Sequence, residues 1–248
     1  MSENAVAERN DTSVVTYEAN GEQIKLSPSM IKKYLVSGNG RITDQEAVMF
    51  MTLCKYQGLN PFIRDAYCIK YSDREPATMV VGKDVYTKRA ERNPKYKGME
   101  NGIIVVNKDG QMEERKGSFY MKGEEIVGGW AKIYIDGREV PQYDSVAFDE
   151  YAGRKKDGSL NTNWKNKPGT MIEKVAIMHA LRNAFPNDFQ GLYVAEEMGL
   201  ESIPEEKHID VKELKEVVAE EVEENANKEE FVVDAEPVEV VENEVENC

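Results

Sequence analysis

Cysteine and histidine are scarce in this chain of 248 residues. The three cysteines are Cys54, Cys68 and Cys248, and no two of them have the spacing of a zinc site. An odd number of cysteines also argues against a disulfide framework. With His179 and His208 as its two histidines, the chain supplies few imidazole ligands for a metal ion. We therefore expect neither a metal nor any other cofactor.

Long apolar runs are lacking as well. The chain contains no stretch of about 18 apolar residues, which is what a membrane-spanning helix requires. The first residues are polar and acidic and have no apolar core of the kind found in a signal peptide. The sequence therefore predicts a soluble, cytoplasmic protein.

The motifs of ATP-driven motors and common hydrolases are also missing. Gly82-Lys83 is not part of a phosphate-binding loop, because Ala77 stands where that loop needs its first glycine and Asp84 where it needs Ser or Thr. Neither a G-x-S-x-G elbow nor an H-E-x-x-H helix occurs. We expect a protein that does not hydrolyse ATP and is not an enzyme.

One enzyme class remains as an alternative. Glu114-Arg115-Lys116, with Asp109 upstream, has the pattern of a Mg²⁺-dependent nuclease, in which carboxylates hold the metal and lysine positions the phosphate. However, Asp109 lies at a predicted hairpin tip, too close in sequence to Glu114 for the two acids to reach neighbouring strands. This arrangement disfavours the nuclease.

Negative charge is concentrated at one end of the chain. The net charge is −14, and residues 199–248 hold 18 acidic and 4 basic residues, which account for all of it. The remaining 28 acidic and 28 basic residues balance, so the body of the protein can carry a basic face.

The pattern of elements predicts an α+β fold. Thr43 and Glu46 form a capping box ahead of a helix that ends at Gly58. Further helices are expected at 28–37, 84–93 and 168–185, and strands at 65–71 and 77–81. Asp-Gly and Lys-Gly turns separate four more strands between 102 and 148, which predicts an antiparallel β-meander packed with helices. Residues 1–24 are expected to form a flexible arm, 25–198 the folded core, and 199–248 an acidic, disordered tail with one possible short helix.

Two basic clusters flank the predicted sheet. Their residue types suit phosphate binding, and the second cluster includes a tryptophan that could stack on a base. On a helix, Lys88 and Arg92 project together because they are four residues apart. An ordinary solvated surface remains the alternative for both clusters. The candidate residues are Lys88, Arg89 and Arg92 in the first cluster, and Arg154, Lys155, Lys156, Trp164, Lys165 and Lys167 in the second.

The predicted helix at 168–185 is apolar nearly all round and should be largely buried. Lys174 and Arg182 interrupt it and lie roughly 12 Å apart along the axis. A buried cation is costly unless it is paired. Either these two side chains meet internal carboxylates, or they line a groove in which phosphates supply the counter-charge.

Three segments resemble the RecT/Redβ (Bet) family of phage recombination proteins. They are the helix from Thr43 ending in Gly58-Leu59-Asn60-Pro61-Phe62, the segment Met79-Val80-Val81-Gly82-Lys83-Asp84, and the stretch from Trp164 through Phe185 to Gly191-Leu192-Tyr193. The similarity covers about residues 26–198, with the segments in the family's order.

The resemblance implies an ATP-independent protein that coats single-stranded DNA, assembles into rings or helical filaments, and anneals complementary strands for homologous recombination. It makes residues 25–198 the DNA-binding, annealing and oligomerisation core. It places Lys174 and Arg182 at positions that contact the DNA backbone. The implied partners are single-stranded DNA, the annealed duplex intermediate, other copies of the chain and a phage 5′→3′ exonuclease, in the cytoplasm of a bacterial host. A host single-strand-binding protein is a further candidate.

The acidic tail has two interpretations. It can act as a solubilising segment, or it can mimic DNA and compete for the basic groove. A different class of function is an adaptor that recruits repair proteins through this tail and has little DNA affinity of its own.

Overall fold

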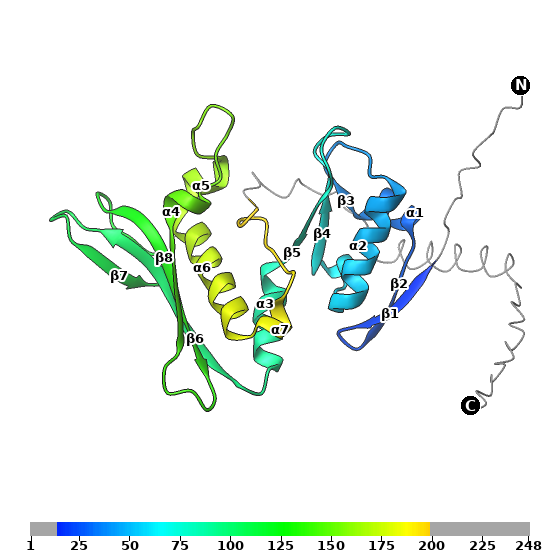
Figure 1. Ribbon diagram of the computed structural model, residues 1–248. Helices are drawn as coiled ribbons and strands as arrows, with labels where there is room; N and C mark the ends of the chain where they lie inside the picture. Colours follow the sequence, from blue (N-terminus) through cyan, green and yellow to red (C-terminus); the bar gives the residue numbers. More distant parts are fainter. Residues whose placement is uncertain (1–13, 199–248) are drawn as a thin grey trace, which may run out of the picture.

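The computed structural model describes residues 14–198, and within them the α+β prediction is confirmed. The predicted arm at residues 1–13 and the predicted acidic tail at 199–248 lie outside the described residues. Figure 1 shows a four-stranded sheet on one side of the molecule and a smaller three-stranded sheet on the other, with α3, α6 and α7 between them. No helix within residues 14–198 is long and apolar enough to cross a membrane.

The described part of the chain begins with a hairpin, so the prediction of a flexible arm was wrong for residues 15–24. Strands β1 (Val15–Ala19) and β2 (Glu22–Leu26) pair antiparallel. Asn20 and Gly21 both have positive φ, which is the geometry of a two-residue hairpin turn. Alternate side chains of both strands are buried, and the Tyr17 hydroxyl donates to the Leu59 carbonyl at 2.7 Å.

The N-terminal helices form largely as predicted. Ser27 caps α1 (Pro28–Met30), which continues as a π-helical turn, η1 (Ile31–Leu35), and ends before Ser37 because β3 (Val36–Ser37) pairs with β4. The capping box at Thr43 starts α2 (Asp44–Gln57), and Gly58 ends it in the left-handed conformation. A short 3₁₀ turn, η2 (Pro61–Ile63), then leads into the smaller sheet.

The smaller sheet has the order β3-β4-β5. Strands β4 (Ala66–Ile69) and β5 (Thr78–Val81) pair antiparallel, and β3 is parallel to β4. Helix α3 (Lys83–Arg92) follows and leads to the large sheet.

The large sheet is antiparallel, but its order is not that of a simple meander. Strands β6 (Tyr96–Val106), β7 (Met112–Lys116), β8 (Glu125–Ile135) and β9 (Gln142–Ala147) have the order β7-β6-β8-β9. Strand β8 pairs with β6 and not with β7. The turn at Lys122-Gly123 is therefore part of a longer connection and does not join two paired strands.

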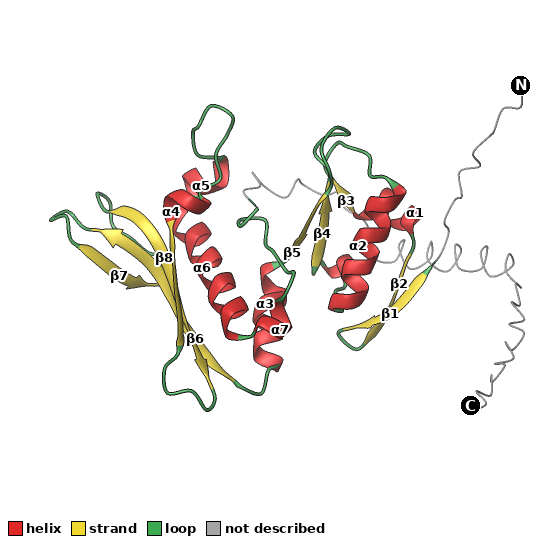
Figure 2. Cartoon of the chain, in the orientation of Figure 1, coloured by secondary structure: helices red, strands yellow, loops and turns green. Residues whose placement is uncertain are grey.

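Helix α6 (Pro168–Ala184) packs on the large sheet, as the red helix beside the yellow strands in Figure 2 shows. Close approach is possible because β8 carries a glycine at the contact. A Cβ on Gly129 would lie 2.6 Å from the Ile172 carbonyl oxygen. The segment between β9 and α6 contains two short helices, α4 (Phe148–Tyr151) and α5 (Thr162–Asn166), and α7 (Pro186–Phe189) follows α6.

Candidate nucleic-acid interface

The two cations of α6 lie on the side of the helix turned away from the sheet. Glu173 points toward the sheet, where it accepts a hydrogen bond from the Asn101 side chain of β6 at 2.6 Å. Lys174 and Arg182 instead meet residues 191–198, which we call the terminal strap. Lys174 Nζ is 2.9 Å from Glu196 Oε1, and Arg182 Nη2 is 2.8 Å from Glu197 Oε2.

The terminal strap is held in place by several elements. The Leu192 carbonyl accepts hydrogen bonds from the Tyr86 hydroxyl of α3 at 2.6 Å and from Arg182 at 3.0 Å. The Tyr193 carbonyl accepts from the Val81 amide of β5 at 2.8 Å. Figure 1 shows the strap running from α7 past α6 and β5, so it connects the parts of the molecule that carry the two larger sheets.

The pair of Arg182 and Glu197 is mostly buried, with side-chain exposures of 20% and 4%. Burial disfavours the charged form of Arg182, but Glu197 and the Tyr86 hydroxyl outweigh this effect, and the pKa of Arg182 is raised. His179 Nε2 also lies 3.3 Å from Glu197. The sequence left two explanations for the cations of this helix, pairing with internal carboxylates or binding of phosphate. The structure shows both cations paired with internal carboxylates. Phosphate binding by Lys174 and Arg182 stays a prediction, and it requires Glu196 and Glu197 to release them.

The basic cluster of α3 is largely engaged with its own chain. Arg89 donates to the Gln57 side chain at 2.9 Å and to the Asp188 carbonyl at 2.6 Å, and burial lowers its pKa. It therefore ties α2 to α7, and in this conformation it is not a free surface cation. Lys88 is half exposed, 3.6 Å from the buried Asp65 carboxylate. Arg92 is exposed and donates to the Asn20 side chain at 3.1 Å.

The second basic cluster lies at the N-terminal end of α6. Lys155, Lys156, Lys165 and Lys167 are exposed, and Arg154 pairs with Asp149 at 2.9 Å. Trp164 is predicted to stack on a base, but its side chain is 0% exposed and packs edge-on against Phe148. The prediction for Trp164 was wrong, because this side chain belongs to the core and offers no face to a ligand.

The residues of the nuclease alternative have other partners. Glu114 accepts a hydrogen bond from the Tyr143 hydroxyl at 2.6 Å, and Lys116 pairs with Glu100 at 2.8 Å. Asp109 lies in the turn after β6. Residues 14–198 contain no group of three or more acidic, cysteine or histidine side chains placed to hold a metal ion.

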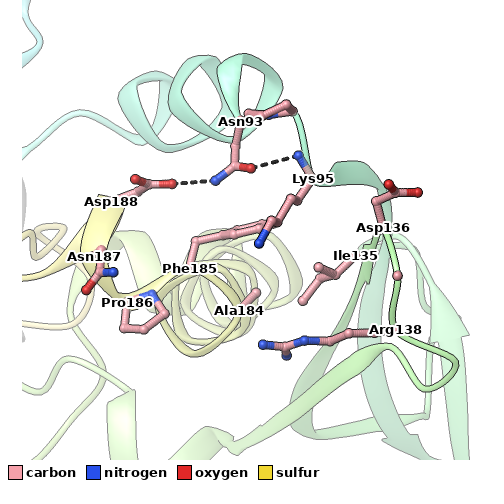
Figure 3. A pocket seen from close by; sticks show the side chains of 12 residues that line it. Asn93, Lys95, Ile135, Asp136, Arg138, Ala184, Phe185, Pro186, Asn187 and Asp188 are labelled. Carbon is pink, nitrogen blue, oxygen red and sulfur yellow. Dashed lines mark hydrogen bonds between the residues drawn. The ribbon is translucent and has the colours of Figure 1, made fainter.

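Lys95, which belongs to the first basic cluster in the sequence, and Arg138 line a recess of about 560 Å³ at the C-terminal end of α6. Figure 3 shows Lys95 and Arg138 extending over this end of the helix, beside Ala184 and Phe185. Arg138 is missing from the sequence-based candidates because it lies in the turn before β9, far from either basic cluster in the sequence.

Comparison with known proteins decides the family. A family model described as the RecT family matches residues 21–211. The chain belongs to the RecT family. An uncharacterized protein of Ureaplasma parvum serovar 3 is similar to it, with 28% identity over 167 residues, which are 65% of this chain and 65% of that protein.

The RecT family match covers the positions of every segment on which the resemblance rests. It begins in the turn between β1 and β2, and it includes α6 and the terminal strap. The salt bridges of Lys174 and Arg182 with the strap therefore lie within the matched region.

Proposed function

We propose that this RecT-family protein binds single-stranded DNA and anneals complementary strands for homologous recombination, without ATP and without catalysing a covalent step. The family match over residues 21–211 carries the proposal. It is supported by the charge balance of the chain outside residues 199–248, which leaves room for a basic surface despite the net charge of −14.

The proposed interface follows α6 from end to end. Exposed lysines stand at its N-terminal end, Lys174 and Arg182 lie along it, and Lys95 and Arg138 line the recess at its C-terminal end. Lys88 and Arg92 of α3 lie beside Asp65 and Asn20. Cations placed in this way grip the sugar-phosphate backbone whatever the sequence, and they leave the base edges available to a second strand. Lys174 and Arg182 would bind phosphate once the strap carboxylates move away. Arg154 and Arg89 hold the neighbouring loop and helices. The other proposed phosphate-binding residues are Lys155, Lys156, Lys165, Lys167, Lys88 and Arg92.

The proposal extends to assembly and partners. Annealing along a strand requires neighbouring protomers to share it, so we propose rings or helical filaments of this chain, in which binding is cooperative. The proposed partners are a phage 5′→3′ exonuclease, which would supply the single strand, and a host single-strand-binding protein. The proposed site of action is the cytoplasm of a bacterial host cell.

Annealing of two complementary oligonucleotides without ATP tests the function, with the DNA length checked afterwards in the presence of Mg²⁺. We expect annealing and intact strands. Lys165→Gln with Lys167→Gln should weaken binding, and the log–log salt slope should become shallower by about 0.7 for each phosphate that these lysines no longer neutralise. Lys25→Gln with Lys55→Gln, exposed lysines on β2 and α2, is the matched control.

Two results would contradict the proposal. Failure of the wild-type chain to bind or anneal single strands refutes the function, and shortening of the strands would favour the nuclease. Equally weakened binding in both double variants would refute the assignment to α6, because the control removes the same charge elsewhere.

A further inference from the structure

Three consecutive large apolar side chains are exposed in the connection between β7 and β8. Phe119, Tyr120 and Met121 have exposures of 74%, 37% and 49%. Scattered exposed apolar residues are ordinary, but a contiguous exposed group marks an interaction site. We call these three residues the aromatic tip.

The aromatic tip stands on a well-anchored connection. The Gly117 amide donates to the Asn101 carbonyl at 2.9 Å, and the Met121 amide donates to the Glu124 carboxylate at 2.7 Å. The Glu124 side chain is itself 2% exposed and pairs with Arg115 of β7. Backbone and ion-pair contacts on both sides therefore hold the tip in the solvent, and it does not fold back onto the core.

The connection touches the basic end of α6. A Cβ on Gly169 would lie 2.6 Å from the Ser118 carbonyl oxygen, so the backbone before the tip abuts the first turn of the helix. Lys165 and Lys167 are exposed just before that turn, and Lys122, also exposed, follows the tip in sequence. Aromatic side chains among cations, on adjoining elements, are the arrangement that holds a single strand by its bases and its phosphates.

We propose that Phe119 and Tyr120 stack on bases of the single strand whose phosphates Lys165 and Lys167 hold. This inference rests on the proposed function. Stacking uses the face of a base and leaves its pairing edge open, so it is compatible with annealing. The two side chains supply the aromatic surface that buried Trp164 does not.

Substitutions at the tip separate stacking from apolar packing. Phe119→Ala and Phe119→Leu should each lower affinity for oligo(dT) by about fivefold or more, the low end for removal of one stacking partner. Phe119→Trp should retain affinity, and DNA should quench the fluorescence of its added indole. The wild-type chain, whose Trp130 and Trp164 are buried, supplies the background signal for this comparison. Tyr56→Ala, at an 81% exposed aromatic on α2, is the matched control and should bind as the wild type does.

The competing explanation for the tip is contact with a second copy of the chain. Full affinity in Phe119→Leu, combined with smaller assemblies of Phe119→Ala in light scattering, would indicate an apolar protein contact and overturn the inference. Wild-type affinity in both Phe119→Ala and Tyr120→Ala would overturn it too. If the wild-type chain itself does not bind oligo(dT), both this inference and the proposed function fail.

Discussion

At the scale of single residues, Glu46 connects three parts of the N-terminal region. Its carboxylate accepts hydrogen bonds from the Thr43 amide at 2.9 Å, the Lys70 ammonium at 2.7 Å and the Ala77 amide at 2.7 Å. Burial opposes its ionisation, but these donors and the positive charge of Lys70 outweigh burial and lower its pKa to about 2. The start of α2 is thereby tied to the end of β4 and to the segment before β5.

The lowered pKa of Glu46 predicts a dependence of stability on pH. A group whose pKa is lower in the folded state stabilises the fold above its unfolded pKa, and this contribution is lost as the pH falls through the folded pKa. From an ordinary pKa of 4.5 and a folded pKa of about 2, the contribution is at most roughly 3 kcal/mol. Denaturant unfolding should show Glu46→Gln less stable than the wild type at pH 6, with the difference shrinking between pH 4.5 and 2. A difference independent of pH would contradict this account.

The Glu46 site shows which residue roles a sequence can predict. The capping box with Thr43 is correctly predicted because its partners are three residues apart. Lys70 is 24 positions away from Glu46, and no local pattern signals that ion pair. The packing of Trp164 against Phe148 and the hydrogen bonds of Arg89 to Gln57 and Asp188 have no local signal either. They depend on chain segments that are brought together only by folding.

At the scale of elements, the terminal strap forms salt bridges with the two cations of α6. If Lys174 and Arg182 bind phosphate, Glu196 and Glu197 compete with DNA for them. Glu196→Gln with Glu197→Gln should therefore raise affinity for single-stranded DNA at low salt and steepen the salt slope, by up to about 0.7 for each cation released. Binding measured by fluorescence anisotropy across a salt series checks both effects.

A variant with the same change of charge controls for overall electrostatics. Glu18→Gln with Glu22→Gln removes two exposed carboxylates on the β1–β2 hairpin and should leave the salt slope unchanged. The strap variant should also lower the melting temperature, because Arg182 is then deprived of the charge that compensates its burial. A lower melting temperature with no gain in DNA affinity would mean that the strap is a structural clasp and that Lys174 and Arg182 do not contact DNA.

The elements themselves show where pattern-based prediction ends. The helices are predicted almost to the residue where caps mark them, as with Thr43 and Gly58. The hairpin at Asn20-Gly21 carries a turn signal of its own, although the region reads as an arm because its strands are short and polar on one face. The order of the strands in the large sheet cannot be predicted from local sequence patterns. The Lys122-Gly123 turn predicts a reversal of the chain, but not that β8 then pairs with β6.

At the scale of the whole molecule, the charge of the chain falls into two parts. Residues 199–248 carry a net charge of −14, and the rest of the chain is neutral. Two roles are open for this acidic segment. It either keeps the protein in solution and does not affect DNA binding, or it occupies the cations that DNA would otherwise contact.

The salt slope distinguishes these two roles, because it counts the counterions released on binding. If the tail stays clear of the basic surface, as its composition favours, the chain ending at Met198 and the full chain should have equal slopes. If the tail occupies those cations, DNA must displace it and fewer counterions are released from the full chain, so truncation steepens the slope. In that case the DNA affinities of the truncated and full chains should converge at high salt. The Debye length falls to about 3 Å at 1 M, so the attraction between tail and body is screened. A steeper slope for the truncated chain, with an unchanged melting temperature, would reject the solubilising role and establish competition with DNA.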